Sequence, residues 1–288
     1  MILNEFAPDP ALRDFVQCYR VLHFKFDPIR PAPVKIYPPK PENVLHFFLK
    51  DGFEIEGVTG KRQKTAPICF IGQRTHISHQ FTAHEIRSFQ IVFQPTAIYR
   101  IFGILGSELT NKCIDAKELF PKQIQFLYEQ FEASVSTKEM IVHANRFLLP
   151  LVRNVKKEKH LIDDVSSLIM KTNGNLSLDF LAKEACLSTK QFKRKFNERT
   201  GVNPKIFGRI NRFTKALNLK NAYPEMNWLR VAIECGHFDY QHLVKDYKDL
   251  TGYTPTGFLL NETKSPEKQL GLTEEVYKAR IVPYKDLL

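Results

Sequence analysis

The sequence predicts two domains. The first is an amino-terminal α+β domain with a small antiparallel β-barrel or sandwich and added helices, and the second is an all-α domain with two helix-turn-helix units joined by a long helix. Three observations predict this fold class: short segments rich in aromatic and β-branched residues before residue 95, apolar residues at helical spacing after it, and an internal repeat within residues 181–255. A chain of 288 residues is long enough for two cores. We expect the domains to span residues 1–155 and 160–262, followed by a tail of unassigned structure over 263–288.

The strands of the first domain are predicted from composition. Each candidate is short, carries aromatic and β-branched residues, and is bounded by turn-forming residues. The candidates are residues 20–26, 44–50, 53–58, 68–72 and 88–94. Lys50, Asp51 and Gly52 predict a hairpin turn between two of them. Short strands at this spacing favour an antiparallel barrel or sandwich over a parallel sheet.

Helical periodicity replaces the strand pattern after residue 95. Apolar residues recur at helical spacing over residues 96–105, 123–135 and 138–152, which we assign to the end of the first domain. The charged stretch 154–160 has no such periodicity and predicts a linker. The second domain then begins with a helix over residues 161–174, which ends at an Asn-Gly pair.

The internal repeat defines two copies of one helical unit. Three residues recur at an offset of 50: Ala182, Glu184 and Ala185 as Ala232, Glu234 and Cys235. After one inserted residue, five recur at an offset of 51: Ser188, Phe192, Phe196, Gly201 and Pro204 as Asp239, Leu243, Tyr247, Gly252 and Pro255. Each copy has the pattern of a helix, a short turn and a capped second helix, which is the organisation of a helix-turn-helix DNA-binding unit.

Capping side chains mark where the helices of the repeat begin. Ser188 followed by Gln191 predicts a capping box at the second helix of the first copy. Asn203 and Thr254 each precede a Pro at a first helical position. The helix over residues 204–222 is therefore expected to be a rod of roughly 28 Å that fixes the separation of the two copies.

The charge of the chain is unevenly distributed between the two copies. The net charge of +11 alone is a weak indication of a polyanionic partner. Residues 189–220, however, hold 10 Lys and Arg against one acidic residue, whereas residues 221–262 hold 3 against 6. We therefore expect the first copy to supply most of the attraction to a polyanion, although a basic helix is often only a solvated surface.

Helical spacing identifies the side chains that would contact DNA. Phe192 and Phe196 lie one turn apart and must face the core, as must Leu243 and Tyr247, so the opposite stripe of each helix faces outward. Lys and Arg suit guanine or phosphate, Gln suits adenine, and Val suits the thymine methyl group. The side chains expected to contact bases are Lys190, Lys193, Arg194, Asn197, Tyr240, Gln241, Val244 and Lys245. Those expected to contact phosphates are Thr189, Lys195, Lys205, Arg209, Arg212 and Lys248.

The carboxyl-terminal part resembles the double helix-turn-helix domain of AraC/XylS-type transcription regulators. The resemblance covers residues 176–260 and rests on LAKEACLS (181–188), TGVNP (200–204), VAIECG (231–236) and KDLTGYTP (248–255), in this order. It implies two recognition helices in successive major grooves of double-stranded DNA. The second copy departs from the family pattern, because His237 stands where Phe is common and Asp246 and Asp249 lie on its recognition helix.

The amino-terminal part is similar, more loosely, to the cupin-like sensing domain that precedes the DNA-binding domain in many of these regulators. This resemblance implies a small-molecule effector, a homodimer formed through the first domain, or both. No residue identifies the effector. Contact with RNA polymerase is a further expectation for a transcription regulator of this type.

A metal-dependent cupin-type enzyme is the first alternative. His76 and His79 are separated by two residues and would face opposite sides of a strand, and the H-x-H and Glu spacing of metal cupins is absent. No P-loop, G-x-S-x-G sequence or Gly-rich dinucleotide turn occurs. We therefore predict no catalytic residue, no metal site and no cofactor. The second alternative is an architectural DNA-binding protein without an effector, which would give no role to a β-rich first domain.

The expected location is the cytoplasm, without a membrane partner. No apolar run approaches the length of a membrane span, and the first residues lack the basic and apolar regions of a signal peptide. Five scattered cysteines predict buried free thiols in a reducing compartment. They are Cys18, Cys69, Cys113, Cys186 and Cys235.

Overall fold

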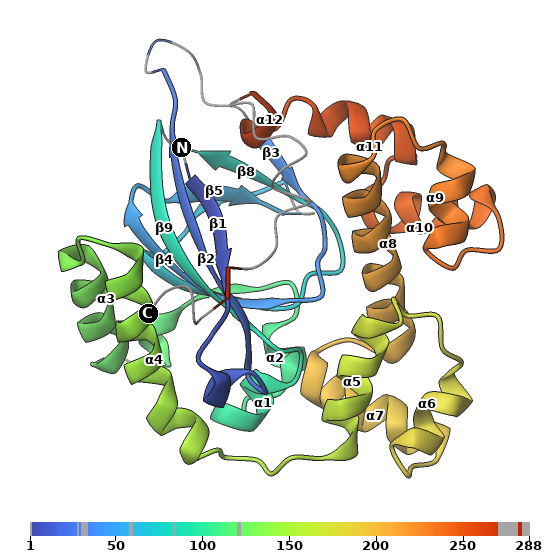
Figure 1. The fold of residues 1–288 in the computed structure, drawn as a ribbon, viewed down its shortest axis with the longest axis horizontal. Helices are drawn as coiled ribbons and strands as arrows, with labels where there is room; N and C mark the ends of the chain where they lie inside the picture. Colours follow the sequence, from blue (N-terminus) through green and yellow to red (C-terminus); the bar gives the residue numbers. More distant parts are fainter. Residues whose placement is uncertain are drawn as a thin grey trace.

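A computed structural model describes residues 2–27, 29, 34–57, 60–82, 84–119, 122–269 and 282–283 of the chain. The strands gather in one part of the molecule, with helices at their outer side, and a second group of helices lies beside them (Figure 1). All strands named below precede residue 116, and from residue 161 onward the named elements are helices. The predicted fold class is thereby confirmed: a β-rich antiparallel first part is followed by an all-helical second part.

Two antiparallel sheets form the first part. The larger sheet has the order β1-β2-β9-β4-β7-β10, with β1 (Ile2–Phe6), β2 (Val16–Lys25), β9 (Glu85–Phe93), β4 (Asn43–Lys50), β7 (Ile68–Ile71) and β10 (Cys113–Asp115). The smaller sheet has the order β3-β8-β5-β6, with β3 (Val34–Tyr37), β8 (Ser78–Thr82), β5 (Phe53–Glu56) and β6 (Arg62–Lys64). The five predicted strands correspond to β2, β4, β5, β7 and β9, apart from Val58 of the third, which lies outside the described residues.

The predicted hairpin at Lys50, Asp51 and Gly52 is wrong. β4 pairs with β7 and β9, whereas β5 pairs with β6 and β8, so the turn carries the chain from one sheet to the other. The backbone does bend there, with a φ of 42° at Asp51. The pairing follows burial instead of proximity in sequence: β4 is buried on both faces and therefore lies inside the larger sheet.

Alternation along the central strands gives the larger sheet two different faces. Tyr19, Phe47 and Phe89 point to one face and are fully buried against the helices that cover it. These helices are α1 (Ala97–Phe102), α3 (Gln123–Ala133) and α4 (Thr137–Arg153). Phe131 of α3 contacts both Phe47 and Phe89, with ring centroids 4.8 and 4.6 Å apart. The opposite face turns toward the smaller sheet and carries polar residues, described below.

Within the described residues, the second part of the chain contains eight helices. They are α5 (Leu161–Lys171), α6 (Leu178–Glu184), α7 (Thr189–Thr200), α8 (Pro204–Ala222), α9 (Trp228–Glu234), α10 (Tyr240–Thr251), α11 (Pro255–Glu262) and α12 (Pro266–Gln269). We call α6 with α7 the first unit and α9 with α10 the second unit. The first unit lies at one end of α8 and the second unit at the other (Figure 1). Most of the tail, residues 270–281 and 284–288, lies outside the described residues.

The predicted capping residues lie at the first turns of the helices and make the expected hydrogen bonds. Ser188 accepts a hydrogen bond from the backbone of Gln191, whose side chain completes the capping box. Asn203, Asp239 and Thr254 cap α8, α10 and α11 in the same way through their side chains. These local contacts fix the start of each helix before any tertiary packing is considered.

The first unit is held against the first part of the chain by a direct backbone contact. A Cβ atom on Gly106, in α2 (Gly106–Leu109), would lie 2.2 Å from the backbone nitrogen of Gly201 at the end of α7. The Thr110 hydroxyl donates to the carbonyl of Gly201 at 2.6 Å. Beside this contact, Arg199 of α7 forms an ion pair of 2.8 Å with Asp163 of α5. Only glycine at both positions allows so close an approach.

The second unit meets the first part through apolar contacts. Ile36 of β3 and Ile77 pack against the cluster that is built from α8, α9, α10 and α11. Near its end, the chain contacts the larger sheet again: Val282 pairs with Phe6 in a parallel bridge at the edge of β1. Both units are therefore anchored to the β-rich part, but by different kinds of contact.

Two general expectations can be compared with the structure. None of the described helices combines the length and apolar character of a membrane span. All five cysteines are free, and Cys18, Cys69 and Cys235 are buried as expected. The expectation fails for Cys113 and Cys186, which are exposed, because Cys113 begins the edge strand β10 and Cys186 lies in the turn after α6 with a φ of 53°.

Candidate nucleic-acid interface

The recognition helix of the first unit, α7, is fixed by its buried side. Phe192 and Phe196 are fully buried, with ring centroids 5.5 Å apart, and Phe196 packs on Phe207 of α8. With this side inward, the predicted stripe faces outward: Lys190, Lys193 and Arg194 are exposed and Asn197 is half-buried. A shallow surface hollow is lined by Thr189, Lys190, Lys193, Arg194, Asn197 and Asn203. The structure thus brings five of the predicted side chains together on one accessible face.

Two predicted contacts of the first unit have partners within the protein. Arg194 forms an exposed ion pair of 2.7 Å with Glu198, one turn away on the same helix. Lys195 points toward α5 instead of the hollow, with its Nζ 3.4 Å from a ring nitrogen of His160. Lys205, at the beginning of α8, is exposed. Of the three, Lys205 is the most available for a phosphate.

The recognition helix of the second unit, α10, repeats this geometry. Leu243 and Tyr247 are fully buried, at the positions of Phe192 and Phe196. On the outward side, Gln241, Lys245 and Lys248 are exposed, whereas Tyr240 and Val244 are half-buried. At the offset of 51, Gln241 and Val244 stand where the first unit has Lys190 and Lys193. The outward face of α10 is therefore less cationic than that of α7.

The arginines of α8 face the second unit. Arg209 Nε donates to Asp246 at 2.7 Å, and its Nη2 donates to Asp249 at 2.6 Å. Arg212 donates to the carbonyl of Gly174 at 2.8 Å and approaches Asp246 at 3.5 Å. Burial alone would lower the pKa of Arg209, but the two carboxylates raise it above its ordinary value. A phosphate contact stays a prediction for Arg209 and Arg212, and both have partners within the protein.

The two lysines further along α8 also have partners in the second part of the chain. Lys215 donates to the carbonyl of Glu234, and Lys220 donates to the carbonyls of Met226, at 2.7 Å, and Pro224. Four of the ten cations in residues 189–220 therefore hold α8 to the second unit and the segment before it.

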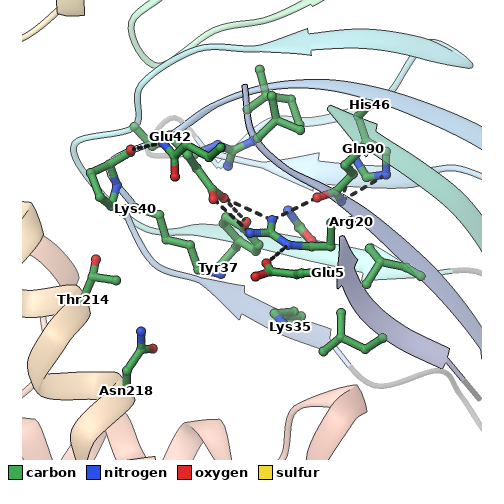
Figure 2. Close-up of a pocket in the computed structure, with 18 of the residues that line it drawn as sticks. Glu5, Arg20, Lys35, Tyr37, Lys40, Glu42, His46, Gln90, Thr214 and Asn218 are labelled. Atoms are coloured by element: carbon green, nitrogen blue, oxygen red, sulfur yellow. Dashed lines mark hydrogen bonds and ion pairs between the residues drawn. The ribbon is translucent and has the colours of Figure 1, made fainter. Parts of the chain in front are cut away.

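A cavity beside α8 is the other candidate site, and it was not predicted. Its β-sheet wall carries a row of polar residues in register across four strands: Glu5 pairs with Arg20, Arg20 with Gln90, and Gln90 with His46. Arg20 donates to Glu5 at 2.7 Å and to Gln90 at 3.0 Å (Figure 2). Because these residues lie on four different strands, only the sheet register brings them together.

Glu42 connects this row to the smaller sheet. It accepts hydrogen bonds from Arg20 at 3.1 Å and from the Tyr37 hydroxyl at 2.9 Å. Burial would raise the pKa of the Glu42 carboxyl, but Arg20 and Lys40 overcome this effect and lower the pKa to about 2. Burial, together with Arg20, lowers the pKa of His46 to about 3, so its imidazole is neutral near pH 7. Near pH 7 this wall therefore holds an ionised Glu42 carboxylate and a neutral His46 imidazole.

The opposite wall of the cavity belongs to the helical part. Asn211, Thr214, Lys215 and Asn218 of α8 line it, and Figure 2 shows Thr214 and Asn218 across the cavity from the Arg20 network. The cavity volume is about 1080 Å³, which is large enough to hold a drug-sized organic molecule. Its charged lining residues are Arg20, Lys35, Lys40, Arg74, Lys215, Glu5 and Glu42.

The histidines considered for a metal site do not gather. His79 lies in β8, whereas His76 lies in the bend before it and His46 stacks on Phe48 in the larger sheet, with centroids 3.9 Å apart. Within the described residues, no three His, Cys, Asp or Glu side chains are arranged to hold a metal ion.

Sequence reasoning missed two features for different reasons. The sequence gives only a weak indication of the cavity: the polar residues Arg20, His46 and Gln90 interrupt strands that are otherwise apolar. The second feature is Phe238, whose side chain is 89% exposed at the beginning of α10. It is the residue inserted into the second copy of the repeat, and the one-residue change of offset was its signal.

Comparisons with known proteins agree with the repeat. Residues 181–261 match the model of a helix-turn-helix domain, and residues 4–115 match that of a domain of unknown function, DUF6597. A search of curated proteins found no match.

Three solved structures show weak similarity to the chain. ToxT from Vibrio cholerae bound to (E)-4-(8-methylnaphthalen-1-yl)but-3-enoic acid has 11% identity and a TM-score of 0.49, with 84% of this chain and 98% of that chain covered. The P21 crystal form of ToxT has 14% identity and a TM-score of 0.48, with the same coverage. The AraC-like transcriptional activator CuxR has 17% identity and a TM-score of 0.23, with 72% and 74% covered.

Proposed function

We propose that this chain is a transcription regulator of the AraC type that binds double-stranded DNA at specific sequences, and the match of residues 181–261 to a helix-turn-helix domain supports this proposal. One observation carries the proposal. Two units, one at each end of α8, have a helix cap and two buried side chains at equivalent positions, and each unit presents an accessible stripe with polar side chains. A stable helical domain needs neither the repeated stripe nor its accessibility, whereas DNA recognition needs both.

The proposed binding combines attraction and selection. Lys190, Lys193 and Arg194 would supply contacts to phosphates and to guanine edges, and Gln241 would pair with adenine. The rod of α8, 19 residues long, spans roughly 28 Å, compared with roughly 34 Å for one turn of B-DNA. The two recognition helices would therefore enter successive major grooves on one side of the duplex.

The test is selection of bound duplexes from a random DNA library with the purified full chain, followed by sequencing. We expect two short half-sites with centres about one helical turn apart. Recovery of a single half-site would assign a structural role to the second unit. Binding without any sequence preference would contradict regulation and favour an architectural protein.

We also propose that an organic anion bound in the cavity beside α8 modulates this regulator. The cavity lining carries five cations against two carboxylates, which gives a positive balance, and apolar side chains such as Phe24, Phe53 and Ile86 line it as well. A ligand with one acidic group and an apolar body would satisfy both. Because α8 forms one wall, such a ligand would contact the helix that joins the two units.

The effector proposal is tested by thermal unfolding of the full chain with matched probes: benzoate against benzyl alcohol, and hexanoate against hexanol. We expect the anion of a pair to raise the Tm and its uncharged counterpart to leave the Tm unchanged. The shift should shrink in Lys40→Ala and persist in Lys61→Ala, an exposed lysine outside the cavity. Equal shifts for both members of each pair would contradict the proposal.

Other expectations stay predictions. They are a homodimer formed through the β-rich part, a contact with RNA polymerase, a cytoplasmic location and the absence of catalysis. The cupin-like character of the first part also stays a prediction.

A further inference from the structure

The residue inserted into the second copy can be identified from backbone hydrogen bonds. The amide of Leu187 donates to the carbonyl of Ala182 at 3.0 Å, and the amide of His237 donates to that of Ala232 at 2.9 Å. His237 therefore occupies the place of Leu187. The helix caps Ser188 and Asp239 are equivalent as well, so Phe238, between His237 and Asp239, is the extra residue.

The insertion leaves Phe238 outside the core of the second unit. In the first unit, the residue before the cap is Leu187, which packs on the core cluster as a hydrophobic staple would. In the second unit, the buried His237 fills that place with 8% exposure, while Phe238 is 89% exposed. Its ring meets the edge of the His242 ring at a centroid distance of 6.3 Å. Phe238 therefore contributes little to folding.

The position of Phe238 points to DNA as its partner. The residue directly precedes the cap of α10, and the amino-terminal end of a recognition helix is the part that contacts base edges. The adjoining outward residues are Gln241, which is exposed, and Val244, which is half-buried, in place of two lysines in the first unit. An amide and two apolar groups suit an A·T pair, because adenine accepts a bidentate Gln and thymine offers a methyl group.

We propose that Phe238 contacts the 5-methyl group of a thymine and that the second unit selects A·T pairs, whereas the cationic first unit selects G·C pairs. The inference rests on the proposed DNA-binding function. It makes the DNA site asymmetric in composition, so that one copy of the chain binds in a defined direction. It also assigns a role in sequence specificity to Phe238, which has no counterpart in the first copy of the repeat.

The experiment removes only the methyl group from the DNA. Each thymine of the selected second half-site is replaced by deoxyuridine, and affinities of the full chain are measured by fluorescence anisotropy. We expect one replacement to weaken binding by about 4-fold, the value of one buried methyl group. The same replacement should have no effect on Phe238→Ala, whereas Phe238→Leu, which keeps an apolar contact, should keep most of the sensitivity.

Controls separate this inference from loss of folding and from failure of the proposed function. Leu229→Ala removes an exposed apolar side chain from α9 of the same unit and should behave like the wild type. Because Phe238 is exposed, Phe238→Ala should keep the wild-type Tm. Independent, additive effects of deoxyuridine and Phe238→Ala, or a second half-site without thymine, would overturn the inference while DNA binding stands. Selection that enriches no sequence would overturn the proposed function itself.

Discussion

The first and second units share one backbone design but use their charges in opposite ways. At the offset of 51, Lys195 of α7 corresponds to Asp246 of α10, and Lys193 corresponds to Val244. In the first unit, the cations of the stripe face solvent. In the second unit, Asp246 is 8% exposed and binds the arginines of α8. The first unit therefore presents its charge, and the second unit uses charge to hold itself to α8.

This difference teaches that charge counted along a sequence is not charge available to a partner. The excess in residues 189–220 includes Arg209, Arg212, Lys215 and Lys220, all of which contact groups within the helical part. The acidic excess of the second unit is likewise partly neutralised from α8. The surface of the second unit is thus less repulsive to DNA than its sequence indicates.

The largest predicted effect is the loss of the charged contact between α8 and α10. Asp246→Ala leaves Arg209 and Arg212 without their shared carboxylate, and we expect it to lower the free energy of unfolding by about 3 kcal/mol. Lys195→Ala, at the equivalent position, should cost about 0.5 kcal/mol or less. Trp228 is the single tryptophan and lies in the second unit, so its fluorescence during urea unfolding reports the first change directly. Circular dichroism follows the unfolding of both variants. An equal loss in the free energy of unfolding for the two variants would contradict the proposed difference between the units.

The next effect concerns DNA specificity. Arg194→Ala should weaken binding to the selected site by roughly 1–3 kcal/mol and relax base choice there, because a guanidinium can bind a guanine edge with two hydrogen bonds. Lys248→Ala, on the recognition helix of the second unit, should weaken selected and random duplexes alike, as loss of a phosphate contact does. Fluorescence anisotropy on both duplexes measures the difference. Equal loss on both duplexes for Arg194→Ala would show that Arg194 contacts only phosphate.

A smaller effect is the contribution of His237, in the second unit, to the pH dependence of stability. Burial lowers the pKa of His237, and the charge of Arg212 adds to this while Asp246 opposes it. The unfolded chain therefore takes up the proton first as the pH falls below about 6.5, and stability is lost toward acid by at most about 1.4 kcal/mol per pH unit. His237→Leu, which restores the residue type of Leu187, should flatten this dependence. Urea unfolding followed by Trp228 fluorescence from pH 7.5 to 5.0 tests it, and an unchanged slope in the variant would contradict the assignment.

The smallest effect separates phosphate contacts from internal ones. Lys205→Ala should reduce the slope of log affinity against log salt by about 1, because one phosphate contact is lost. Arg209→Ala should leave the slope unchanged, since its guanidinium already binds Asp246 and Asp249. Titrations of one selected duplex between low and moderate salt measure both slopes. A reduced slope for Arg209→Ala would return Arg209 to the DNA interface.

The helical part was predictable because its signals are local. Ser188, Asn203 and Asp239 cap their helices through backbone groups three residues away, and the long helix ends where the periodicity ends. The smaller sheet was mostly missed, because β6 is a short, exposed strand and β3 is a short, half-buried strand whose partner β8 lies far along the chain.

The candidate sites show the same division. The outward stripes of α7 and α10 follow from the period of the helix, which needs no tertiary information. The partners of Arg209 do not follow from it, because Asp246 is 37 residues away and meets Arg209 only after α10 packs on α8. The row of Glu5, Arg20, Gln90 and His46 likewise needs the register of four strands, which composition does not specify.

The place of α8 as both the cavity wall and the rod between the units has a consequence for how DNA would be measured. B-DNA advances about 3.4 Å for each base pair and turns fully in about 10 base pairs. The distance between the recognition helices therefore sets the number of base pairs between the two half-sites. A molecule that shifted one unit relative to α8 by the height of one base pair would carry that unit's recognition helix onto the neighbouring base pair and around the duplex axis. Occupancy of the cavity would then select among DNA sites by the spacing of their halves, with the sequence of each half unchanged.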